Sequence, residues 1–151
     1  MTMINEMRLD FKAKPENEAF ARLAISGFIL PLDPTMEELA DVKTAVSEAV
    51  TNAIIHGYAG AAGIVRLCAG YEENGDLQID IIDRGCGISD VEQARQPFFT
   101  TSRDEERSGM GFTVMESFMD EVSVHSAPGH GTTVRLSKRI HQRDEALPRR
   151  A

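Results

Sequence analysis

The chain has 151 residues, a formal net charge of −8, 42% hydrophobic residues and 26% charged residues. This length suits one globular domain, and no apolar run approaches the roughly 20 residues of a membrane-spanning helix. The acidic balance argues against binding to nucleic-acid phosphates, so we expect protein partners with basic or mixed-charge surfaces.

The N-terminal residues indicate a cytoplasmic protein, in which the two cysteines are expected to be reduced. Residues 1–11 contain acidic side chains and lack the apolar stretch of a secretory signal peptide. Cys68 and Cys86 do not have the spacing of metal ligands. In the cytosol we expect both to be free thiols that pack as small residues.

The first part of the chain predicts a strand and then a helix. Alternating apolar residues predict a strand over residues 8–13, which Pro15 ends. Asn17 can cap a helix in which Glu18 and Arg22 form an exposed pair one turn apart, as in an ordinary surface salt bridge. The apolar positions of this helix recur at helical spacing and are Phe20, Leu23, Ala24, Gly27 and Phe28.

A longer helix is predicted over residues 35–58. Thr35 and Glu38 form a capping box, in which each side chain accepts a hydrogen bond from the backbone of the other residue. The apolar stripe of this helix consists of Val42, Val46, Ala49, Val50 and Ala53. Nearly opposite lies a polar row at successive i, i+4 steps, formed by Glu48, Asn52 and His56. Such a row by itself is most often the solvated face of an amphipathic helix.

A β-hairpin is predicted next, with strands over residues 64–71 and 77–82 and an Asn-Gly turn at residues 74–75. Asp83 has the same parity as Ile81 and so falls on the apolar face of the second strand. Because a buried charge is costly unless it is paired, two interpretations stay open. Either the strand has ended and Asp83 lies in a loop, or the site supplies a hydrogen-bonding partner.

The rest of the chain predicts a short helix, a mobile loop, a second helix and a β-hairpin. These elements are expected at residues 91–96, 98–111, 112–119, 121–126 and 132–140. Residues 141–151 are polar and are expected to form a frayed tail, which leaves one domain over residues 1–140. The order of elements predicts an α+β fold, a two-layer sandwich with a mixed, mostly antiparallel sheet and helices on one face.

Four separated stretches carry candidate chemistry. They are Glu48-x-x-x-Asn52, Asp83-x-Gly85-x-Gly87, Gly109-x-Gly111 and Gly131-Thr132-Thr133. Each alone is weak, because a Gly-x-Gly is most often a turn. Together and in this order, over about residues 35–138, they resemble the GHKL ATPase superfamily of gyrase-type ATPases, Hsp90 chaperones, mismatch-repair ATPases and histidine kinases. The resemblance implies the GHKL (Bergerat) type of two-layer sandwich.

Nearly the whole chain is similar to one group within this superfamily, the anti-sigma factors of endospore-forming bacteria. The similar stretches are NEMRLDF, NEAFAR, DPTMEEL, SEAVTNAIIHGY, RQPFFTT, ERSGMGF and GTTVRL. This resemblance implies an ATP-dependent protein serine kinase that forms a homodimer and binds and inhibits a sporulation sigma factor. With Mg²⁺ and ATP, such a kinase phosphorylates a serine of an anti-anti-sigma factor. No direct contact with nucleic acid or membrane is implied.

The resemblance also assigns roles along a bound nucleotide. Asn52 is expected to ligate Mg²⁺ through its amide oxygen, and Glu48 to act as the general base. Asp83 is expected to accept a hydrogen bond from the adenine amino group. Gly85 and Gly87 would let the backbone pass close to the base and the sugar.

At the phosphate end, Gly109 and Gly111 open a helix, whose N-terminus favours phosphate. Arg107 matches a residue that contacts the γ-phosphate. The matching ATP lid contains three hydroxyl residues, Thr100, Thr101 and Ser102, and the alternative that they are ordinary polar loop residues stays open.

Four further residues complete the assignment. Thr132 matches a threonine that contacts the adenine pocket, directly or through a water. His56 is either a phosphate neighbour or a structural histidine, and both interpretations stay open. Glu18 and Arg22 match the partner-binding surface of the family.

Glu48 separates this function from the main alternative, a nucleotide-gated binding module without phosphoryl transfer. A module that only binds would not need a carboxylate one turn before the Mg²⁺ ligand. A catalytic fragment that serves a histidine is disfavoured, because no phosphoacceptor helical hairpin is visible upstream.

Overall fold

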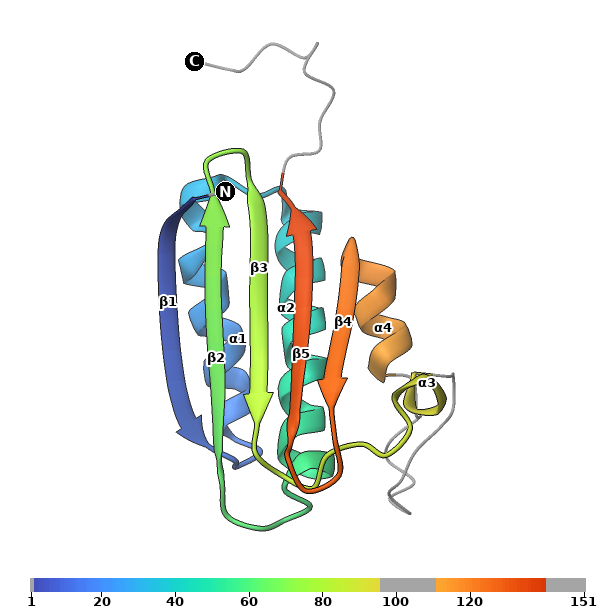
Figure 1. Ribbon diagram of the computed structural model, residues 1–151. Coiled ribbons are helices and arrows are strands. Elements are labelled where there is room, and N and C mark those ends of the chain that lie inside the picture. Colours follow the sequence, from blue (N-terminus) through green and yellow to red (C-terminus); the bar gives the residue numbers. More distant parts are fainter. Residues whose placement is uncertain (1, 96–110, 141–151) are drawn as a thin grey trace, which may run out of the picture.

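A five-stranded sheet forms one layer of the computed structural model, which describes residues 2–95 and 111–140 (Figure 1). In spatial order the strands are β1 (Met3–Lys12), β2 (Ile64–Glu72), β3 (Asp76–Asp83), β5 (Thr132–Arg139) and β4 (Glu121–Ser126). All four neighbouring pairs are antiparallel. The predicted α+β class is therefore confirmed, and the sheet that was expected to be mixed is antiparallel throughout the described residues.

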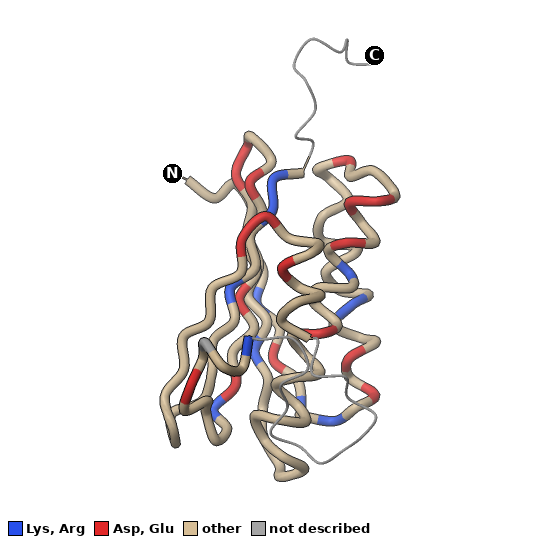
Figure 2. Tube along the Cα trace, turned by 90° about the vertical axis from the view of Figure 1, so that its right-hand side faces the viewer, with Lys and Arg blue, Asp and Glu red and all other residues tan. Residues whose placement is uncertain are grey.

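Helices form the second layer, on one face of the sheet (Figures 1 and 2). They are α1 (Asn17–Phe28), α2 (Met36–Asn52) and α4 (Gly111–Phe118), while the short α3 (Val91–Ala94) contacts β4. A 3-10 turn, Leu30–Leu32, leads from α1 toward α2, and α2 contacts both α1 and α4. Among the described residues, no helix has the length and apolar character needed to cross a bilayer.

The core lies between the helices and the sheet. Its largest buried side chains include Val42, Val46 and Val50 from α2 and Leu77, Ile79 and Ile81 from β3. Burying one such side chain stabilises the fold by about 1.5–3 kcal/mol. The apolar stripe of α2 therefore anchors this helix on the sheet and directs its polar row away from the core.

The boundaries of α2 show where local sequence decides the structure. The predicted capping box is confirmed, because Thr35 Oγ1 accepts from the Glu38 N–H at 3.0 Å and Glu38 Oε1 accepts from the Thr35 N–H at 2.9 Å. Beyond Asn52 the helix widens into a π-helical turn, Ala53–Gly57, which a helical period alone does not reveal. Such turns are rare and occur frequently at functional sites.

Helix α1 differs from its prediction in two respects. Glu16, not Asn17, is the N-cap, and the Asn17 side chain instead donates to the Lys12 carbonyl at 2.9 Å. The buried face is formed by Ala21 and Ile25, whereas Phe20 and Leu23 are 50% and 71% exposed. Two apolar stripes overlap on this helix, and the small Ala21 allows the close approach to the rest of the core.

Other boundaries moved by a few residues. Strand β1 begins at Met3 rather than at residue 8, and β3 extends through Asp83 rather than ending at Ile82. Cys68 and Cys86 are free thiols, as predicted, but Cys86 is exposed, so the expectation that it packs as a small residue is wrong. The expected tail over residues 141–151 lies outside the described residues and stays a prediction.

Candidate functional site

Asp83 is a buried carboxylate at the end of β3. It pairs with Thr132 of β5 in the sheet register and is only 5% exposed. Burial raises its pKa above the ordinary value of 3.8, while hydrogen bonds from the backbone of Gly85 and Thr132 act in the opposite direction. The Gly85 N–H donates to Asp83 Oδ1 at 2.9 Å. Of the two interpretations left open by the sequence, the second is correct, because Asp83 is a strand residue that the site supplies with donors.

The π-helical turn brings the end of α2 against this carboxylate. A Cβ atom on Gly57 would lie 2.7 Å from Asp83 Cγ, and one on Gly85 would lie 1.8 Å from the Gly57 carbonyl oxygen. That carbonyl accepts from the Cys86 N–H at 2.8 Å. Glycine is needed at residues 57 and 85 for this close approach, since any side chain would separate the helix from the loop after β3.

Gly87 closes the same loop against the turn between β4 and β5. Its φ is +76°, and a Cβ atom there would lie 2.0 Å from the Ala127 carbonyl oxygen. The Gly129 N–H donates to the Cys86 carbonyl at 2.7 Å. The loop after β3 is therefore enclosed by backbone on two sides.

Thr132 lies beside Asp83 and is 8% exposed. Its hydroxyl is 2.8 Å from the hydroxyl of Ser126, which accepts from the Ile88 N–H at 2.7 Å and donates to the Gly131 carbonyl at 2.9 Å. Either hydroxyl can donate to the other, and in both cases Thr132 keeps at least one lone pair for another donor. Two acceptors, Asp83 and Thr132, thus lie side by side.

A second cluster lies one turn earlier on α2, where α4 begins. A Cβ atom on Gly111 would lie 3.0 Å from Asn52 Nδ2, 3.3 Å from Asn52 Oδ1 and 3.5 Å from Glu48 Oε2. The first residue of α4 therefore lies against both polar side chains. A helix N-terminus has free N–H groups and the positive end of the helix dipole, so the cluster combines anion-binding amides with an amide oxygen and a carboxylate.

The family model of the histidine kinase-like ATPase domain matches residues 11–138. The anti-sigma F factor of Halalkalibacterium halodurans is 57% identical over 139 residues, which is 91% of this chain and 94% of that protein. The anti-sigma F factor of Bacillus subtilis is 55% identical over the same shares of the two chains. This chain belongs to the anti-sigma F factor family of histidine kinase-like ATPases. The predicted resemblance is confirmed.

Solved structures of two other proteins have the same fold as this anti-sigma F factor family member. The RsbU and RsbW domains of Rv1364c from Mycobacterium tuberculosis match with a TM-score of 0.65 and 20% identity, over 90% of this chain and 32% of that chain. The catalytic domain of the histidine kinase ThkA matches with a TM-score of 0.56 and 13% identity, over 89% of this chain and 96% of that chain. At these identities the likeness establishes the fold alone.

The remaining predicted residues fall in three places. His56 lies in the π-helical turn, where its backbone carbonyl accepts from Cys86 Sγ at 3.2 Å. Glu18 and Arg22 lie on α1, with Arg22 Nε 3.7 Å from Glu18 Oε1. Their pair is less exposed than predicted, because Ser47 of α2 donates to Glu18 and the Glu18 side chain is only 21% exposed. Outside the described residues lie Thr100, Thr101, Ser102, Arg107 and Gly109, whose roles stay predictions.

Sequence reasoning missed two contributors to the site, Gly57 and Ser126. Ser126 could have been found from the register of the β4–β5 hairpin, which places it opposite Thr132. Gly57 carries no such signal, since its contact with Asp83 joins segments that are far apart in the chain.

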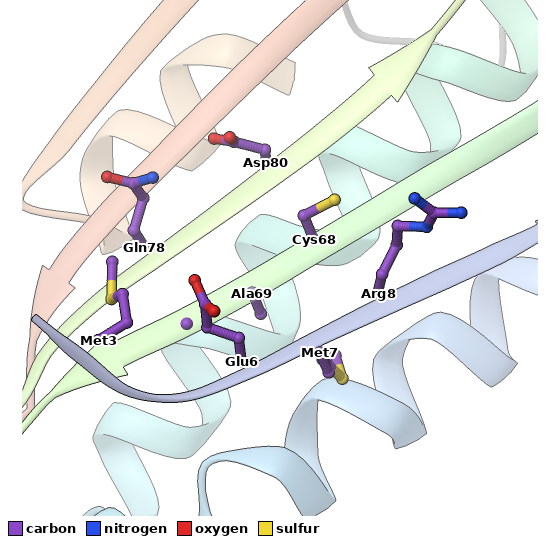
Figure 3. Close-up of a pocket in the computed structure, with 9 residues that line it drawn as sticks. Met3, Glu6, Met7, Arg8, Cys68, Ala69, Gln78 and Asp80 are labelled. Atoms are coloured by element: carbon purple, nitrogen blue, oxygen red, sulfur yellow. The ribbon is translucent and has the colours of Figure 1, made fainter.

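A separate depression lies on the open face of the sheet and contains no predicted site residue (Figure 3). Arg8, Cys68, Gln78 and Asp80 are among its lining residues. Burial raises the pKa of the Cys68 thiol, which disfavours the reactive thiolate. The candidate site is therefore the pair of clusters at the end of α2.

Proposed function

We propose that this protein is a cytoplasmic serine kinase and anti-sigma factor. With Mg²⁺ and ATP it phosphorylates a serine of an anti-anti-sigma factor, and it binds and inhibits a sporulation sigma factor. The observation that carries the kinase proposal is the meeting of Glu48, Asn52 and Gly111 at the N-terminus of α4. The names of the relatives support the anti-sigma role.

The adenine base fits the end of the site that contains Asp83. A buried carboxylate with a raised pKa gains most from a ligand that donates hydrogen bonds, and the exocyclic amino group of adenine is such a donor. Thr132 offers a second acceptor next to it. The close backbone contact between Gly57 and Gly85 holds the end of the π-helical turn against the loop that follows Asp83.

The phosphates fit the other end. Asn52 has an amide oxygen suited to Mg²⁺, which usually takes one or two protein ligands and completes its shell with phosphate oxygens and water. When bound, Mg²⁺ would neutralise charge on the phosphates and orient the γ-phosphate. The N-terminus of α4 and the predicted Arg107 would bind phosphate oxygens.

Glu48 is the proposed base. In the proposed transfer the serine hydroxyl oxygen attacks the γ-phosphorus, the bond to the oxygen that bridges the β- and γ-phosphates breaks, and ADP leaves. The serine proton passes to the Glu48 carboxylate. Its position one turn before Asn52 supports this role, because the proposed base would then lie beside the proposed Mg²⁺ ligand.

Helix α1 is the proposed partner surface, and we propose that the kinase acts as a homodimer. Arg22 is 44% exposed on this helix, and two apolar side chains, Phe20 and Leu23, are exposed on either side of it in the sequence. A cation among exposed apolar side chains is typical of the centre of a protein interface.

The decisive experiment mixes the purified chain with γ-labelled ATP and a candidate anti-anti-sigma protein. We expect label on a serine of that protein. If ATP binds and alters the binding of a sigma factor but no label is transferred, the protein is a nucleotide-gated binding module instead. If ATP does not bind at all, the proposed function is wrong.

A further inference from the structure

Tyr58 joins three segments that surround the candidate site. It follows the π-helical turn, and its ring lies on Gly63, where a Cβ atom would be 2.3 Å from Tyr58 Cε1. Its hydroxyl donates to the Ile64 carbonyl at 2.6 Å and accepts from the Arg84 N–H at 2.8 Å. The hydroxyl therefore connects the first residue of β2 with the residue directly after Asp83.

The loop after β3 has three consecutive amides with three different acceptors. The Arg84 N–H donates to the Tyr58 hydroxyl, the Gly85 N–H to the Asp83 carboxylate and the Cys86 N–H to the Gly57 carbonyl. Two of these acceptors, Gly57 and Tyr58, lie at the end of the π-helical turn. The Gly57 acceptor is a backbone carbonyl, which no substitution removes. The Tyr58 acceptor is a side-chain hydroxyl, and a conservative substitution can remove it without moving the backbone.

We propose that Tyr58 is a positioning residue for nucleotide recognition. Its hydroxyl holds the Arg84 amide, and thereby the backbone that directs the Gly85 N–H at the Asp83 carboxylate. Tyr58 acts through this loop and does not itself touch the nucleotide. The inference rests on the proposed function, in which Asp83 accepts from adenine.

A purely structural role for the hydroxyl would have different consequences. It would lower the melting temperature on removal but leave the preference for adenine unchanged. A positioning role must alter nucleotide selectivity, because Asp83 is the group that distinguishes an amino group from an oxygen on the base. Selectivity is therefore the measurement that separates the two roles.

The test is Tyr58→Phe, which keeps the ring on Gly63 and removes only the hydroxyl. We expect the Kd for ATP to rise by about two- to tenfold, the effect of one net hydrogen bond. The preference for ATP over inosine triphosphate, which has an oxygen in place of the amino group, should fall. The transfer rate at saturating ATP should change far less than the Kd, because Glu48 and Asn52 are untouched.

Tyr71→Phe is the matched control. Tyr71 lies near the opposite end of β2, and its hydroxyl accepts one hydrogen bond, from Asn5 Nδ2 at 3.0 Å. Tyr71→Phe also removes one tyrosine hydroxyl, and we expect the affinity of this variant for ATP to be unchanged. Hydrogen exchange without nucleotide gives a second readout, in which the Arg84 amide should exchange faster in Tyr58→Phe and not in Tyr71→Phe.

Several outcomes would overturn the inference. They are wild-type affinity and selectivity in Tyr58→Phe, an equal loss in Tyr71→Phe, or unchanged exchange of the Arg84 amide. A wild-type protein that does not bind ATP would contradict the proposed function and this inference together, whereas a failure confined to Tyr58→Phe would contradict this inference alone. If Tyr58→Phe does not fold, hydrogen exchange of the wild-type protein is the deciding measurement. The inference then requires that ATP slows exchange of the Arg84 amide.

Discussion

Carboxylates lie on both faces of the sheet, in opposite surroundings. On the open face, Asp10 and Asp76 accept hydrogen bonds from arginines on neighbouring strands, which hold the pKa of each carboxyl below 3.8. On the helix-covered face, Asp83 is buried without a guanidinium partner among the described residues, and burial raises its pKa.

The two faces show that a carboxylate can have two different roles in this protein. A carboxylate paired with arginine in solvent contributes little to stability and is chemically satisfied. A desolvated carboxylate that has only backbone donors costs stability and retains the capacity to accept from a ligand. Substitutions on the two faces should therefore affect different properties.

The largest expected effect is on phosphoryl transfer and comes from the helix-covered face. Glu48→Gln keeps the shape of the side chain and removes the base, so the transfer rate should fall by about 100- to 10,000-fold. Calorimetry should show ATP binding close to that of the wild type. Undiminished label transfer would remove Glu48 from the role of base.

The second-largest expected effect is on the affinity for ATP. Asp83→Asn replaces a charged acceptor by a neutral one, which should weaken ATP binding by roughly 10- to 150-fold, the value of a hydrogen bond to a charged group. Without ATP, the free energy of unfolding at neutral pH should not fall, because the variant no longer buries a charge. A lower melting temperature with unchanged ATP affinity would mean that Asp83 is structural.

The pH dependence of stability should have opposite signs on the two faces. Between 3.8 and the raised pKa of Asp83, the folded chain holds more protons than the unfolded chain, so this group destabilises the fold progressively as pH rises. The stability of Asp83→Asn relative to the wild type should thus increase across that window. Chemical denaturation at several acidic pH values measures this difference.

Asp76→Asn is the control on the open face. Arg139 lowers the pKa of Asp76, so its contribution is complete above 3.8 and is lost as pH falls through the lowered value. The stability deficit of this variant should therefore disappear in acid. The same pH trend for both variants would contradict the comparison of the faces.

The smallest effect is expected from Arg135→Gln. Arg135 Nε lies 2.8 Å from Asp80 Oδ1 on the open face, and the arginine side chain is 46% exposed. An ion pair of this exposure contributes about 0–1 kcal/mol, so the melting temperature should barely change and ATP binding should not change. A large loss of ATP affinity would show that the two faces are coupled.

Much of the fold could be predicted because its signals are local. The capping box at Thr35, the Asn-Gly hairpin and the alternation in β3 each depend on residues a few positions apart. The position of Asp83 on an apolar face was visible for the same reason, since a strand has a period of two. The prediction of a nucleotide site at Glu48, Asn52 and Asp83 came instead from the resemblance of four short motifs, taken together, to the GHKL ATPases.

The buried face of α1 could not be predicted in this way. Phe20 and Leu23 fit one helical stripe and Ala21 and Ile25 fit another, and the sequence pattern allows both. Packing against α2 and the sheet selects the second stripe. The exposed stripe then becomes available to a partner.

The sequence by itself determined the class of fold, the family and the residue types at both ends of the candidate site, because these depend on periodicity and on short motifs. Only the tertiary structure decided that the π-helical turn brings Gly57 within contact distance of Asp83 and that Tyr58 bonds to Arg84. Those contacts join residues more than 20 positions apart, and their geometry depends on how α2 packs on the sheet.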